Sequence, residues 1–194
     1  MCRGCQAIRK WNACSSCGAF TRRGFTQGGF YDHFSKEALV SQVIGKVMDE
    51  GRQQLGAAIA QSRRRGADPL IRQIRWCLSP THRDDIDCGG PIAGFAGEIP
   101  HLSKAAQASY DEGLEHIFNQ IAQLVLEHDP TLTREEAHGR AISLYSHMVG
   151  SVLLSRAASA SQPALADEIL KQGRSSILAD LSQPSANPPR VRTV

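Results

Sequence analysis

Apolar residues recur at three- and four-residue spacing along the chain from residue 36 onward, and no stretch alternates in the way that a half-buried strand does. The three- and four-residue spacing gathers apolar side chains on one face of a helix. The pattern predicts a short helix at 92–99 and five longer ones, at about 36–61, 69–78, 103–127, 133–158 and 163–181. The predicted fold class is therefore all-α.

Several helix ends are marked by residue types that cap helices. Asp68 stands directly before a proline, which is typical of an N-cap followed by the first helical residue. Thr133 with Glu136 has the spacing of a capping box. Ser79–Pro80 is expected to stop the second helix, and the polar segment Thr81–Pro91 reads as a loop.

The composition indicates an ordinary globular protein: 194 residues, 41% of them hydrophobic and 21% charged. No apolar run reaches the length of about 18 residues that spans a bilayer, and the first residues lack the apolar core of a signal peptide. We therefore expect no membrane association and a cytoplasmic location. Residues 1–65 hold eleven Lys and Arg against four Asp and Glu, whereas residues 66–194 hold eleven against fifteen. That asymmetry either favours a polyanion as the partner of the N-terminal third or is a chance excess of surface arginines.

Two separated segments have distinctive sequences. The first is GFTQGGFYDHFSKEALV, residues 24–40, with a glycine turn, an aromatic pair and His-Phe before Lys-Glu-Ala-Leu. The second is CLSPTHRDD, residues 77–85, followed by a glycine-rich turn and PIAGFAGEI, residues 91–99. Together with the order of the helices, these segments resemble the TetR family of transcriptional regulators over residues 24–181.

The resemblance implies that the first segment holds the turn and recognition helix of a helix-turn-helix. The implied DNA contacts are Thr26, Gln27, Gly28, Gly29, Tyr31, His33 and Lys36. The chemistry is suitable, since a hydroxyl at a helix N-terminus can meet a phosphate and Gln27 can pair with an adenine edge. Without the resemblance, Tyr31 and His33 would be interpreted as a packed aromatic residue and a surface histidine.

The resemblance also implies a function, that of a ligand-responsive repressor acting as a homodimer on a palindromic double-stranded DNA operator. The two last long helices would pair across the dimer axis, and a small-molecule effector would bind among the middle helices. Candidates for the pocket are Trp76, Phe95, Tyr110 and Phe118, each of which also fits ordinary core packing. The predicted divisions are an atypical segment at 1–23, a partial helix-turn-helix with its connecting helix at 24–66, an effector-binding and dimerisation domain at 67–182, and a disordered tail at 183–194.

The chain departs from the family pattern at its beginning. A complete domain of this kind has two helices before the turn, and residues 1–23 show neither. The spacing between His-Phe and Ser-Lys-Glu is one residue shorter than usual, which would rotate Lys36 by about 100° around its helix. The loop also has Cys-Gly-Gly-Pro where the family tends to place its cysteine directly before the proline. A start read in the wrong frame, or a decayed gene, would explain these departures. A helical dimer that no longer binds DNA is the resulting alternative.

Four cysteines form two C-x-x-C pairs, Cys2/Cys5 and Cys14/Cys17, separated by eight residues. Four thiolates can close a tetrahedral zinc site, but zinc ribbons usually have about 12 to 20 residues between the pairs. A disulfide is disfavoured in a reducing compartment. We expect no metal and no cofactor, with a zinc knuckle as the alternative.

No enzyme motif is present, and we expect no catalytic residue. The sequence lacks a nucleophile elbow, a P-loop, a His-Glu-x-x-His pair and a dinucleotide fingerprint. Glu135-x-x-His138 is half of a di-iron motif without its second half, and we reject it. The loop residues His82, Asp84, Asp85, Asp87 and Cys88 are metal-ligand types, but such loops are usually solvated turns. A thiol that senses electrophiles at Cys77 or Cys88 is the less common alternative to an unreactive cysteine.

Overall fold

The structure is a computed structural model, and it describes residues 36–85 and 91–182. All the regular secondary structure in these two ranges is helical, in agreement with the predicted all-α class. The elements are α3 (Lys36–Arg64), α4 (Pro69–Cys77), α5 (Pro80–Asp84), α6 (Pro91–Phe95), the 3-10 helix η2 (Ile99–His101), α7 (Lys104–His128), α8 (Arg134–Ala158) and α9 (Pro163–Ser182).

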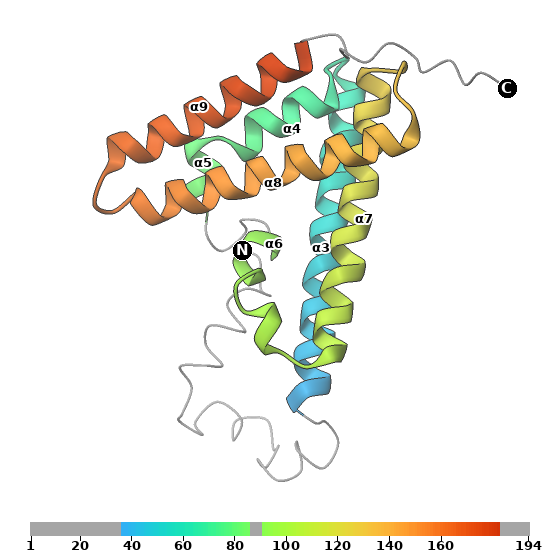
Figure 1. Cartoon of the computed structure of the whole chain (residues 1–194), viewed down its shortest axis with the longest axis vertical. Coiled ribbons are helices and arrows are strands. Elements are labelled where there is room, and N and C mark those ends of the chain that lie inside the picture. Colours follow the sequence, from blue (N-terminus) through green and yellow to red (C-terminus); the bar gives the residue numbers. More distant parts are fainter. Residues whose placement is uncertain (1–35, 86–90, 183–194) are drawn as a thin grey trace, which may run out of the picture.

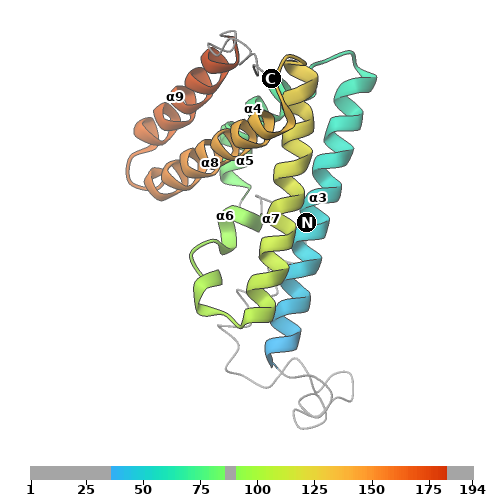
Figure 2. The same ribbon diagram turned by 45° about the vertical axis from the view of Figure 1, so that its right-hand side comes forward.

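The two longest helices form the axis of the molecule. α3 and α7 lie side by side along their length and run in the same direction (Figures 1 and 2). α8 and α9 form an antiparallel hairpin that extends sideways from one end of this pair, with α4 and α5 packed against it (Figure 1). α6 and η2 lie in the angle between α7 and α8. α3 therefore extends from Lys36, at one end of the α3–α7 pair, into the part of the molecule that contains α4 and α8 (Figure 1).

The predicted helix caps are confirmed. The Asp68 side chain accepts a hydrogen bond from the Ile71 amide at 3.0 Å. Thr133 and Glu136 form both halves of the capping box, with the Thr133 amide donating to Glu136 at 2.8 Å and the Glu136 amide donating to Thr133 at 3.2 Å. The long helices consequently begin and end within a few residues of the predicted positions.

Two local predictions were wrong. The segment predicted as a loop from Thr81 begins with a helix, α5, because Ser79 accepts a hydrogen bond from the His82 amide and Pro80 takes the first helical position. The same Ser-Pro pair that ends α4 thus starts α5. The short helix expected at 92–99 is divided into α6 and η2, with Gly97 between them.

The core follows the predicted apolar faces, and glycines let helices approach closely at two places. α7 buries Ile117, Ile121, Leu124 and Val125. A Cβ atom at Gly113 would lie 2.6 Å from Cβ of Met48, so the backbones of α3 and α7 approach each other closely there. A Cβ atom at Gly173 would lie 2.5 Å from the Ser151 hydroxyl, which places α9 equally close to α8.

Within the described ranges, none of the helices is both long enough and apolar enough to cross a membrane. The predicted segments 1–23 and 183–194 and the four paired cysteines lie outside the described residues.

Candidate functional site

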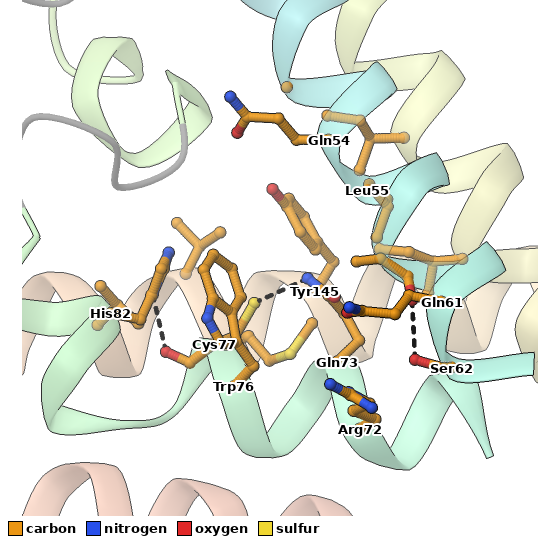
Figure 3. Close-up of a pocket in the computed structure, with 17 residues that line it drawn as sticks. Gln54, Leu55, Gln61, Ser62, Arg72, Gln73, Trp76, Cys77, His82 and Tyr145 are labelled. Carbon is orange, nitrogen blue, oxygen red and sulfur yellow. Dashed lines mark hydrogen bonds between the residues drawn. The ribbon is translucent and has the colours of Figure 1, made fainter. Parts of the chain in front are cut away.

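The main candidate site is a cavity of about 360 Å³ enclosed by α3, α4, α7 and α8, with His82 of α5 at one side (Figure 3). Its size is within the range of small-molecule pockets. It is lined by Gly51, Gln54, Leu55, Ala58, Gln61, Ser62, Arg72, Gln73, Trp76, Cys77, His82, Ile117, Ile121, Tyr145, Met148, Val149 and Val152.

The walls of the cavity are mostly apolar and its rim is polar. Leu55, Ile117, Ile121 and Met148 are buried core residues that also face the cavity. Gln54 and Gln61 on α3 are exposed, and the Trp76 side chain on α4 is 50% exposed. The cavity therefore opens to solvent between α3 and α4, beside the Trp76 ring.

His82 is held as a neutral ring with a defined tautomer. Its Nδ1 lies 2.9 Å from the carbonyl oxygen of Cys77, and since a carbonyl only accepts, Nδ1 carries the proton. Burial lowers the pKa of His82, and the nearby Arg156 guanidinium adds to this effect, while the hydrogen bond to Cys77 and the charge of Asp85 oppose it. The ring is consequently uncharged at neutral pH, and its Nε2 is an acceptor.

Cys77 forms part of the cavity wall as an unreactive thiol. Its Sγ accepts a hydrogen bond from Nε2 of Gln73 at 3.3 Å. Burial raises the pKa of Cys77 to about 12. Because the thiolate is the nucleophilic form, this environment does not favour reaction with electrophiles at neutral pH. Cys88, the other candidate thiol, lies outside the described residues.

Tyr145 on α8 brings a phenol group to the cavity. Burial is the main cause that raises its pKa above the ordinary value, so the phenol stays protonated. Phe118 meets its ring edge-on at a centroid distance of 6.0 Å. No hydrogen bond joins the Tyr145 hydroxyl to any residue in the described ranges, although the hydroxyl points into the cavity (Figure 3).

Arginines of α8 and α9 donate hydrogen bonds to backbone carbonyls of the α4–α5 segment, which forms one wall of the cavity. Arg156 donates to the carbonyl oxygens of Arg83 at 2.9 Å and His82 at 3.1 Å, and Arg174 donates to that of Leu78 at 3.1 Å. The Arg83 side chain, 11% exposed, bridges Asp84 at 2.7 Å and Asp167 of α9 at 2.6 Å. These bonds satisfy carbonyls at the ends of α4 and α5, which a short helix cannot satisfy by itself.

The predicted effector-pocket residues are only partly brought together. Trp76 lines the cavity. Phe95 is partly buried against the core, and Phe118 packs between His138 and Tyr145 rather than facing the opening. The Tyr110 hydroxyl is buried and donates to the carbonyl oxygen of Ile92 at 3.2 Å, which is a structural role. These three side chains do not line the cavity.

The predicted DNA contacts Thr26, Gln27, Gly28, Gly29, Tyr31 and His33 lie outside the described residues. Lys36 is the first residue of α3, and its side chain is also outside the described part. Among the residues that are described, no group of three or more His, Cys, Asp or Glu side chains is arranged to hold a metal ion.

For two of the cavity residues, the sequence pattern favoured a role other than lining a cavity. Tyr145 follows the apolar period of α8, which favours a core position, and His82 was considered only among the metal-ligand types of a predicted loop. Both line the cavity only because α8 packs against α4 and α5 in the folded chain.

His82 predicts a loss of stability at mildly acidic pH. The unfolded chain binds a proton at His82 near pH 6.5, whereas the folded chain resists it, so the free energy of unfolding falls as the pH drops below that value, by at most about 1.4 kcal/mol per pH unit. Urea titrations at pH 7.5 and 5.5 should show a smaller difference in the His82→Asn variant than in the unmodified protein.

The exposed His147→Asn substitution is the matched control for this measurement and should keep the full pH dependence. An equal slope in the His82→Asn variant and the unmodified protein would show that His82 titrates normally in the folded chain.

No protein-family model matches the chain, and no curated protein matches it. The function has therefore to be inferred from the residues themselves.

Proposed function

We propose that this protein is a ligand-responsive transcription regulator that resembles the TetR family and acts as a homodimer on a palindromic operator. The observation that carries the proposal is the position of the cavity. One side of it is α3, through Gln54, Leu55 and Ser62, and the other side is α8, through Tyr145 and Val149. A ligand in this cavity would contact both helices at once.

α3 provides the link to the proposed DNA-contacting segment. Residues 24–35 precede it directly in the chain, and they hold the sequence that resembles a recognition helix. α3 is 29 residues long and packs along α7, so it can move as a rigid element. A displacement of α3 at the cavity would be carried to its first residue, Lys36, and so to the segment before it.

The hairpin of α8 and α9 supports a dimer. The large apolar side chains left exposed in the described part of the chain are Trp76 and four others, all on this hairpin: Ile142, Leu153 and Leu154 on α8 and Leu165 on α9. We call these four the apolar strip. Large apolar side chains exposed on one element favour an interaction surface there, and two copies of a helical hairpin can bury them as a four-helix bundle.

The proposed mechanism is a shift between two dimer arrangements that differ in the separation of the recognition segments. The ligand would favour the arrangement in which the cavity fits it best, and it can shift the equilibrium only by its difference in affinity for the two. An operator has two half-sites at a fixed spacing, so a change in separation weakens binding to both at once.

DNA binding tests the proposal. Mobility-shift titrations at physiological salt would compare the full chain on DNA from the region upstream of its gene with a shuffled duplex of equal length. We expect affinity for the upstream DNA to exceed that for the shuffled duplex by a factor of about 1,000 or more. Gln27→Ala should lower this ratio, whereas Ala57→Glu, on the exposed face of α3, should leave it unchanged.

Binding that depends on salt but not on sequence would contradict an operator function, since phosphate contacts alone give that behaviour. No binding at all would leave the helical dimer without DNA binding as the remaining interpretation.

A further inference from the structure

Among the polar side chains that line the cavity, Tyr145 and His82 are not exposed, and each has an atom without a hydrogen-bond partner in the described residues. The Tyr145 hydroxyl forms no hydrogen bond with any residue in ranges 36–85 and 91–182, and neither does Nε2 of His82. Figure 3 shows the hydroxyl and this second ring nitrogen both pointing away from the α4 backbone, toward the side where Gln54 lies. Neither atom is sealed from solvent, so water can satisfy both, and a ligand that displaced this water would have to supply the same hydrogen bonds.

The two groups have complementary chemistry. His82 can only accept at Nε2, because its Nδ1 already donates to Cys77, while the Tyr145 phenol is protonated and can donate. The smallest group that both accepts and donates a hydrogen bond is a hydroxyl. The remaining wall near these residues is apolar, including Val149, Val152 and the Trp76 ring.

The described residues that line the cavity near Tyr145 and His82 supply no formal charge to pair with a charged ligand. Arg72 is the single residue with a formal charge among the described residues that line it. Arg72 lies at the edge of the cavity beyond Gln73, away from the Tyr145 hydroxyl (Figure 3). Tyr145, His82 and Cys77 are all uncharged at neutral pH.

We propose that the cavity binds an uncharged, largely apolar molecule whose hydroxyl group accepts a hydrogen bond from the Tyr145 phenol, with Nε2 of His82 available as the acceptor for a donor of the same molecule. A cavity of about 150 Å³ already holds benzene, so about 360 Å³ accommodates a substituted aromatic ring. The inference rests on the proposed function only in treating this cavity as the effector site.

Calorimetric titration of the full chain with three probes tests the proposal. The probes are 4-propylphenol, propylbenzene and 4-propylbenzoate, which share one apolar body and differ in their polar group. At pH 7.5, 4-propylphenol should bind roughly three- to tenfold more tightly than propylbenzene, as expected for one or two net hydrogen bonds. Tyr145→Phe, which removes only the hydroxyl, should reduce this ratio toward one and leave propylbenzene unaffected.

Tyr110→Phe is the matched control, because it removes a hydroxyl that does not line the cavity. It should change neither affinity, and thermal unfolding should confirm that both variants are folded. Equal binding of 4-propylphenol and propylbenzene would overturn the proposal, as would an unchanged ratio in Tyr145→Phe or no binding of any probe. Tightest binding of 4-propylbenzoate, lost in Arg72→Gln, would overturn it in favour of an anionic ligand. The titration contains no DNA, so its outcome is independent of whether the chain binds an operator.

Discussion

Replacing Gly113 with valine is expected to lower the free energy of unfolding by about 3 kcal/mol. A Cβ atom at this position would lie 2.6 Å from Cβ and 2.7 Å from Cε of Met48, which is itself 1% exposed. The Met48 Cβ is fixed by its backbone, so α3 and α7 would have to move apart along their contact. Urea denaturation of the purified variant, followed by circular dichroism, measures the change.

Gly139→Val on α8 is the matched control, because a Cβ atom there meets nothing within 4 Å. Val and Gly differ by only a few tenths of a kcal/mol in helix propensity, so this variant should keep nearly the full stability. Met48→Ala combined with Gly113→Val should recover part of the loss, since it removes two of the three clashing atoms. If the two valine variants are equally stable, α3 and α7 are not in the close contact described.

The sequence predicts the helices of this fold well because their signals are local. The apolar periodicity of α7 and α8 and the caps at Asp68 and Thr133 depend on residues within one or two helical turns. The error at Thr81 has an equally local cause: Ser-Pro both ends one helix and starts the next, and the pattern does not say whether a loop lies between. Arg156, 75 residues further along the chain, helps to hold the resulting turn.

The candidate cavity could not be predicted in the same way, because its residues come from helices that meet only in the folded chain. Aromatic residues on the middle helices were the natural candidates, and Tyr110 and Phe118 are aromatic residues of α7 used in packing. Sequence alone does not reveal that the Tyr145 hydroxyl has no hydrogen-bond partner among residues 36–85 and 91–182, or that Nδ1 of His82 is engaged by the Cys77 carbonyl. Those two facts decide the polarity of the cavity, and they require the positions of α4, α5 and α8.

Hydrogen bonds and an ion pair connect the cavity wall to the helices that carry the proposed dimer surface. Arg156 joins α8 to the carbonyl oxygens of His82 and Arg83, and Arg83 joins α5 to Asp167 of α9. His82 is thus attached to the two helices that carry the apolar strip. A ligand that hydrogen-bonds to Tyr145 would contact α8 directly, and one that hydrogen-bonds to His82 would contact it through Arg156. Coupling between the cavity and a dimer requires such contacts to differ between the two dimer arrangements.

Introducing charge into the apolar strip is expected to separate the proposed dimer into single chains. Leu154, 63% exposed on α8, and Leu165, 46% exposed on α9, contribute little to the fold of one chain, so Leu154→Glu with Leu165→Glu should leave monomer stability nearly unchanged. In a dimer interface the carboxylates would be buried without partners, which is strongly unfavourable. Light scattering after size-exclusion chromatography should then give the mass of one chain, 21.1 kDa, in place of twice that value.

Operator binding should fall together with the dimer, because two linked half-site contacts gain about 100-fold or more over a single one. Ala57→Glu, an equally exposed charge on α3, serves as the control and should retain both the dimer and the operator complex. If the double variant stays dimeric, the chains associate through another surface. If it becomes monomeric but binds the operator as tightly as before, the recognition segments do not act as a pair, and ligand control through their separation is excluded.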